Sequence, residues 1–186
     1  NFLTTKTYDI FLFINGLLAT ILIGTAVGTF FTGSEFSVDK LNITQTADNV
    51  ISRWQGPANG LEAALNITNL ALGVSLFVLS RVLGAMYIIN SINHDGIIAR
   101  ARKTLKLCSG AFLVFFVLFL VLILTKEVFA VNPDTKIVFM EEYKYLNNFL
   151  AMPIVTAIFL IGVVLVVFGM YKAAFTKSTK GIWFAG

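Results

Sequence analysis

The feature that most constrains this chain is the run 61–90, which is apolar over a length that can cross a lipid bilayer. A transmembrane helix needs about 20 consecutive, mostly apolar residues. Three further runs have this character, at about 10–31, 107–124 and 148–171. Backbone N–H and C=O groups find no water within lipid, so such segments cross as helices. The sequence therefore predicts an all-α integral membrane protein with four transmembrane helices in an antiparallel up-down bundle.

The composition agrees with this fold class. Hydrophobic residues make up 57% of the 186 residues and charged residues only 13%, whereas about a quarter of a soluble domain is charged. We expect residues 1–186 to form a single transmembrane domain. The chain starts at Asn1 without a signal peptide and ends in an aromatic stretch that resembles the entry to another span, so we also expect it to be an internal fragment of a longer protein.

The basic residues predict the orientation of the helices. Lys and Arg are enriched in short cytoplasmic segments, and the segment 91–106 carries Arg100, Arg102, Lys103 and Lys106. The segment 32–60 has two basic residues over a greater length, and 125–147 has three beside four acids. We expect a cytoplasmic loop at 91–106, cytoplasmic chain ends, and outward loops at 32–60 and 125–147. The net charge of +4 then reflects membrane orientation, and nucleic acid is not a predicted partner.

Small and polar residues mark the helix faces that meet protein. Gly24 and Gly28 form a small-xxx-small pair, which predicts close approach by a neighbouring helix. In the run 61–90, Glu62, Asn66, Asn69 and Gly73 follow one another at spacings that place them on one helical face. Asn66 and Asn69 are predicted to form interhelical hydrogen bonds. Glu62 is interpreted as a helix-start acid, or else as a proton-exit or quinone-associated carboxylate.

Arg81 is the most informative charge, because an ionisable residue within a membrane helix needs a partner or a role. One interpretation is structural: its guanidinium reaches toward the headgroups or pairs with Asp9 at the start of the first span. The other places Arg81 at a lipid, quinone or proton path. Both interpretations remain open from the residues alone.

The chain has few residues that could ligate a metal or haem iron. It contains one histidine, His94, and one cysteine, Cys108, which excludes a transmembrane bis-His haem site and an intramolecular disulfide. It also lacks a paired-Cys motif and a Gly-rich phosphate loop. We predict no catalytic residue, no bound cofactor and no metal ion on this chain.

Four stretches, taken in order, resemble subunit II of the cytochrome bd-type quinol oxidases, in the form found in Bacteroidetes-like bacteria. They are TYDIFLFING at 7–16, LIGTAVGTFFTGSEF at 22–36, GLEAALN at 60–66 and AMP at 151–153. The resemblance covers essentially the whole chain. It implies a multi-pass protein of the bacterial inner membrane, in a complex that oxidises ubiquinol or menaquinol and reduces dioxygen to water.

The resemblance also implies a division of labour. Haems b and d would belong to subunit I, and this chain would scaffold that subunit and contribute to proton, oxygen or quinone passage. Its other partners would be membrane lipid and the missing remainder of the same subunit. A transporter subunit and a plain tetraspan scaffold are the alternatives, although unbroken spans without an internal repeat disfavour a transporter.

The Asp9–Arg81 interpretation makes a testable prediction. A charge at the centre of a membrane helix costs about 2.5–3.5 kcal/mol on insertion scales, and Arg does not lose its proton. Asp9→Asn should therefore destabilise the assembled complex, and adding Arg81→Gln should restore much of the loss. The measurement is a double-mutant cycle on thermal stability, and simple additivity would exclude the pair.

Overall fold

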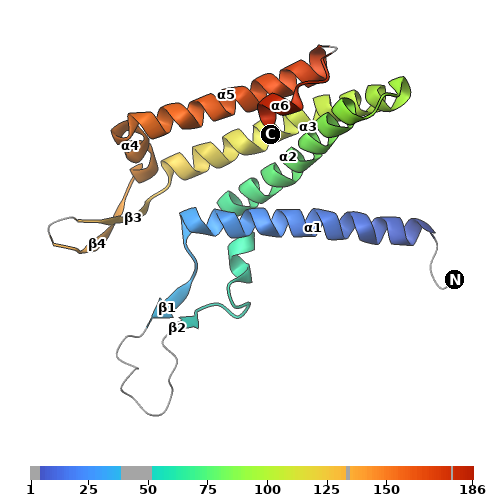
Figure 1. The fold of residues 1–186 in the computed structure, drawn as a ribbon. Coiled ribbons are helices and arrows are strands. Elements are labelled where there is room, and N and C mark those ends of the chain that lie inside the picture. The colour runs from blue at the N-terminus through green and yellow to red at the C-terminus, as the bar shows by residue number, and fades with distance from the viewer. Residues whose placement is uncertain (1–4, 39–51, 133–134, 177) are drawn as a thin grey trace. The chain divides into compact units, whose positions relative to one another are not determined.

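The computed structural model describes residues 5–38, 52–132, 135–176 and 178–186. Within them, four helices are long and apolar enough to cross a membrane: α1 (Thr5–Thr32), α2 (Ile67–Ser91), α3 (Asp95–Thr125) and α5 (Pro153–Phe175) (Figure 1). This confirms the predicted all-α membrane protein. The chain divides into two compact units, Asn1–Gly73 and Val74–Gly186, and each is described by itself. The bundle arrangement and the orientation stay predictions.

Unit 1 contains α1, a short hairpin and the start of α2. The expected outward loop 32–60 includes strand β1 (Phe36–Val38), which pairs antiparallel with β2 (Ser52–Trp54); residues 39–51 lie outside the described part. Phe36 lies opposite Trp54, and the two rings meet edge to face with centroids 6.1 Å apart. This aromatic pair stabilises the end of the hairpin where the chain arrives from α1.

The prediction of one continuous helix over 61–90 is wrong at its start. Residues Leu61–Leu65 form a 3₁₀ helix, η2, and Asn66 is extended with φ −66° and ψ 124°. The Asn66 side-chain oxygen accepts the N–H of Thr68 at 3.0 Å, which is the bond of an N-cap, so α2 begins at Ile67. The shared face predicted for Glu62, Asn66, Asn69 and Gly73 is therefore wrong as well, because only the last two belong to α2.

Within unit 1, glycines bring α1 and the first turns of α2 together at backbone distance. Gly24 and Gly28 are both buried. A Cβ added at Gly28 would lie 2.8 Å from the Asn69 side-chain oxygen and 2.9 Å from its Cα, and one at Gly73 would lie 2.7 Å from the Ile21 carbonyl oxygen. All three distances are shorter than van der Waals contact, so these two positions have room for glycine only.

Unit 2 is built from the rest of α2, α3, α5 and short elements around them. One face of each of the helices α2, α3 and α5 packs into a common apolar core. Many of the core residues on one helix are three or four positions apart, the spacing of a single helical face. The core residues are Val78, Val82, Ala85, Met86 and Ile89 from α2, Ala101, Leu105 and Phe112 from α3, and Met170, Ala173 and Ala174 from α5.

The prediction of a loop at 91–106 is wrong for most of its length. Helix α3 begins at Asp95, so only residues 92–94 connect it to α2. His94 is extended and its carbonyl accepts the N–H groups of Ile97 and Ile98, which starts the helix. Hydropathy marks where a helix meets lipid and not where it begins, so hydropathy alone interprets the basic first turns of α3 as a loop.

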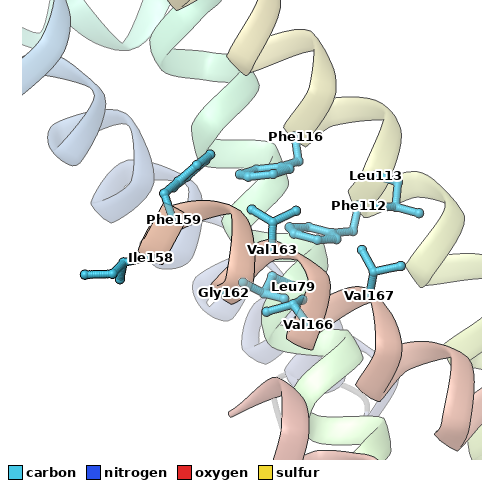
Figure 2. A pocket seen from close by; sticks show the side chains of 10 residues that line it. All are labelled: Leu79, Phe112, Leu113, Phe116, Ile158, Phe159, Gly162, Val163, Val166 and Val167. Atoms are coloured by element: carbon cyan, nitrogen blue, oxygen red, sulfur yellow. The ribbon is translucent and has the colours of Figure 1, made fainter. Parts of the chain in front are cut away.

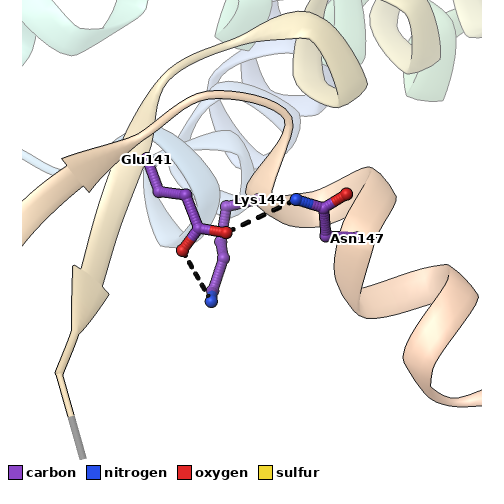
Figure 3. Close-up of polar contacts among 3 residues, drawn as sticks. All are labelled: Glu141, Lys144 and Asn147. Carbon is purple, nitrogen blue, oxygen red and sulfur yellow. Dashed lines mark hydrogen bonds and ion pairs between the residues drawn. The ribbon is translucent and has the colours of Figure 1, made fainter.

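The expected outward loop 125–147 contains a second hairpin, β3 (Val128–Val131) with β4 (Val138–Glu141), and the first turn of α4 (Lys144–Ala151). Figure 3 shows the polar contacts where β4 passes into α4. Lys144 forms an ion pair of 2.8 Å with the Glu141 carboxylate, which Asn147 also reaches with a hydrogen bond of 3.4 Å. The hydrogen bond from Lys144 is the main cause of a lowered pKa at Glu141, so the acid stays charged at this turn.

The prediction that the last span begins at Asn148 is also wrong, because the helix breaks at Met152, with φ −119° and ψ 71°. Pro153 is the cause: it disfavours helical geometry at the preceding residue and has no N–H to give to the Phe149 carbonyl. The Thr156 hydroxyl donates to that carbonyl at 2.5 Å. The break thus leaves no orphaned acceptor at Phe149, and α5 starts with proline at its first position.

After α5 the chain turns back in the short helix α6 (Ile182–Ala185), which packs on the end of α5. A Cβ added at Gly169 would lie 2.7 Å from the Gly181 carbonyl oxygen, and one at Gly181 would lie 2.6 Å from the Gly169 carbonyl oxygen. The two glycines therefore permit backbone contact between the end of α5 and the chain just before α6.

Gly28 provides a test of this packing. Gly28→Ala should destabilise the complex by about 1–3 kcal/mol, because the new methyl group would overlap the Asn69 backbone. Gly16→Ala is the matched control in the same helix, since nothing lies within 4 Å of its added Cβ. Thermal unfolding of the purified complex measures both. Equal melting temperatures for the two variants would contradict the close approach.

Candidate functional site

Asn69 is the polar centre of unit 1. Its side chain is fully buried. The Thr32 hydroxyl donates to the Asn69 side-chain oxygen at 2.9 Å, and the Asn69 amide donates to the Ala63 carbonyl at 2.9 Å. One side chain thus joins the end of α1, the 3₁₀ helix η2 and the first turns of α2. Because a buried amide without partners is costly, these bonds hold the three segments in one geometry.

Glu62 lies in the first turn of η2 and binds the backbone before it. Its two carboxylate oxygens accept the N–H groups of Ala58 at 2.6 Å and Gly60 at 2.9 Å, and they lie so close to Gly56 that a side chain there would overlap them. Backbone hydrogen bonds, first its own N–H and then that of Ala58, lower the pKa of Glu62. The lowered pKa favours the charged carboxylate, as suits a helix-start acid. The role of Glu62 stays a prediction.

Asn66 accepts hydrogen bonds from nearby backbone N–H groups at the start of α2. Its side chain caps α2 through Thr68, and its carbonyl accepts the N–H of Leu70 at 2.8 Å. The structure places the bond between helices at Asn69 and the cap at Asn66. Sequence alone gives the two asparagines the same role, because it does not show where the helix begins.

Arg81 lies in the middle of α2, within unit 2, with an exposed side chain. It lines a cleft of about 240 Å³, whose other wall residues are small or aliphatic apart from Thr104: Gly84, Ala85, Ile88 and Ala101. Asp9 is exposed on α1, which belongs to unit 1. The ion pair between Asp9 and Arg81 stays a prediction.

The residues that could ligate a metal are spread through the chain. His94 lies at the N-cap of α3 and is exposed, and Cys108 is half-buried further along the same helix. Across residues 5–38, 52–132, 135–176 and 178–186, no three His, Cys, Asp or Glu side chains come together as metal ligands would.

Sequence reasoning missed an apolar groove in unit 2. The groove has a volume of about 320 Å³ and lies where α2, α3 and α5 meet. Figure 2 shows the side chains that line it, among them Phe112 and Phe116 from α3 and Phe159, Gly162 and Val166 from α5. The only sequence signal is Gly162, a missing side chain between large apolar neighbours, which is too common in membrane helices to be diagnostic.

Comparison with protein families decides the identity of the chain. The profile of the family described as cytochrome bd terminal oxidase subunit II matches residues 3–186. The chain belongs to this family. Searched against curated proteins, it has no match.

Family membership selects among the functional alternatives. The chain is part of a respiratory oxidase, and the interpretations as a transporter subunit or a plain tetraspan scaffold are set aside. It is a multi-pass protein of the bacterial inner membrane. A subunit II implies a subunit I as its partner, in a complex that uses haems b and d and quinol.

The lowered pKa of Glu62 predicts a pH-dependent stability. The folded state binds fewer protons at this group than the unfolded state, so its contribution is present above the ordinary pKa and is lost as the pH falls through the folded pKa. Glu62→Gln should lower the melting temperature of the complex at pH 7, and this deficit should shrink toward pH 4.

Glu62→Asp serves as the control, because it keeps the charge on a side chain that is too short to reach both N–H groups. It should show an intermediate melting temperature at pH 7. A deficit of Glu62→Gln that is the same at both pH values would show that the charge of Glu62 contributes nothing.

Proposed function

We propose that this chain is the haem-free subunit of the oxidase, which scaffolds the haem-bearing subunit I and contributes to proton, oxygen or quinone passage. The observation that carries the proposal is its single histidine, which lies at the N-cap of α3 and outside the apolar part of that helix. A b-type haem in a membrane bundle needs axial ligands from facing helices. The electron-transfer chemistry is therefore assigned to the partner.

The exposed helix surfaces support a scaffolding role. On α1, Leu12 and Phe30 are 71% and 84% exposed, and on α5, Leu160 and Ile154 are 54% and 76% exposed. Such surfaces are compatible only with lipid or with other apolar helices. A neighbouring subunit can bind them through shape and dispersion contacts, since the hydrophobic effect gives no preference for protein over lipid inside a bilayer.

Arg81 supports a restricted role in passage. Arg keeps its proton under all physiological conditions, so it cannot relay protons itself. A fixed cation in a cleft of unit 2 can hold a carboxylate such as Asp9, or donate hydrogen bonds to the carbonyl oxygen of a quinone. Among the described residues, none that lines the apolar groove has a titratable side chain, and we assign no proton step to it.

The proposal predicts that His94 is dispensable for haem binding. His94→Ala in the complex with subunit I should leave the haem content and the quinol-dependent oxygen consumption unchanged. Asn93→Ala is the control for disturbing this connection, because the two residues are neighbours in the same exposed segment. The measurements are the haem absorption of the size-purified complex and its oxygen uptake. Loss of one haem per assembled complex from His94→Ala alone would refute the haem-free assignment.

A further inference from the structure

The first turns of α3 and the end of α5 form a basic cleft in unit 2. It has a volume of about 430 Å³ and is lined by Arg102, Lys103 and Lys106 from α3, by Phe175 at the end of α5 and by Thr176, which follows it. The Lys106 ammonium lies 5.0 Å from the centre of the Phe175 ring, a cation–π contact that holds this cation beside the cleft. The cleft therefore combines three cations with an apolar wall.

The cations of this cleft are not neutralised by acids of the described residues. The Nε atom of Arg102 is buried and has no hydrogen-bond partner among the described residues. In the part of the chain that the structure describes, no acid forms an ion pair with Arg102, Lys103 or Lys106. Buried donors in proteins are normally paired. An arginine beside two ammonium groups has the chemistry of a phosphate site, because Arg binds phosphate oxygens in a fork.

The same face of α3 leads from the cleft to the apolar groove. Arg102, Lys106, Ser109, Leu113 and Phe116 follow at spacings of four, three, four and three, so they form one stripe along the helix. Leu113 and Phe116 line the groove, and the buried hydroxyl of Ser109, between the two sites, also has no partner among the described residues. Leu113 lies about 10 Å along the helix from Lys106, within the roughly 15 Å of one leaflet.

We propose that unit 2 binds one anionic glycerophospholipid. Its phosphate lies in the basic cleft, held by Arg102, Lys103 and Lys106, and one acyl chain follows the α3 stripe into the apolar groove. The predicted orientation places this end of α3 on the cytoplasmic side, where anionic headgroups attract basic residues near the membrane surface.

The composition of the groove wall favours a hydrocarbon chain over a quinone as the ligand of the groove. A quinone headgroup carries two carbonyl oxygens that need donors. Among the residues that the structure describes, only Leu, Ile, Val, Phe and Gly form the groove wall. A free phosphate ion would satisfy the cations but would leave the groove unused. A phospholipid meets both requirements with one molecule.

The test uses the purified two-subunit complex in nanodiscs or detergent. Native mass spectrometry counts the phosphatidylglycerol molecules retained, with phosphatidylcholine as the reference lipid. Each lost charge should weaken retention about fivefold, so the double change Arg102→Gln with Lys106→Gln should lower the affinity at least tenfold. Arg100→Gln is the matched control, because it removes a charge from the same turns but from a residue that does not line the cleft.

The groove is tested separately by Gly162→Leu, which should fill it, since nothing lies within 4 Å of a Cβ added there. Gly110→Leu is the control on α3: its added Cβ is equally unobstructed and the residue does not line the groove. Gly162→Leu should reduce retained phosphatidylglycerol and Gly110→Leu should not. Equal retention by wild type, the double variant and Gly162→Leu would overturn the proposal, as would competition by inorganic phosphate at equal strength. The haem content of each variant tests the assembly independently.

Discussion

The need to satisfy backbone polar groups within the bilayer is the constraint on which the rest of the structure depends. Long helices meet it automatically, and the informative places are those where a helix breaks. Pro153 removes a donor from the Phe149 carbonyl, and the Thr156 hydroxyl replaces it. Asn66 interrupts the chain before α2, and its side chain accepts the Thr68 N–H. A side chain thus makes the missing hydrogen bond at both of these breaks, and the irregular segments remain compatible with positions beside the membrane.

Close packing is the second requirement, because lipid offers apolar side chains the same environment as a protein interior. Association of helices in a bilayer is favourable only where their surfaces fit closely or form hydrogen bonds with each other. Gly28 against Asn69 provides both, since the missing side chain allows the approach and the amide binds Thr32 and Ala63. The contact of Gly169 with Gly181 holds the end of α5 in the same manner, without a polar group. Both units thus contain a close backbone contact that glycine permits.

The polar residues serve different purposes in the two units. Asn69 and Glu62 have their oxygen atoms occupied by neighbours within unit 1, in a way that stabilises structure. In unit 2, Arg81 and the Arg102 cluster are cations beside clefts, and both are suited to binding a negative or electron-rich ligand. The proposed lipid site and the proposed scaffolding role are thus based on different residues, and each can fail without the other.

The sequence by itself determined the class of protein, the four membrane segments and the family. Length and hydropathy are local properties, so 10–31 and 107–124 identify membrane helices without knowledge of their neighbours. It also indicated Gly24 and Gly28 as packing positions, because small residues at this spacing let another helix approach closely.

Only the tertiary structure decided where the helices begin and which polar groups meet. Helices α2, α3 and α5 begin at Ile67, Asp95 and Pro153. These start positions depend on caps and on single hydrogen bonds, which a hydropathy window does not detect. The bond between Thr32 and Asn69, the apolar groove and the basic cleft each join segments far apart in the chain. Their geometry arises from packing, and packing is a property of pairs of helices that no single segment encodes.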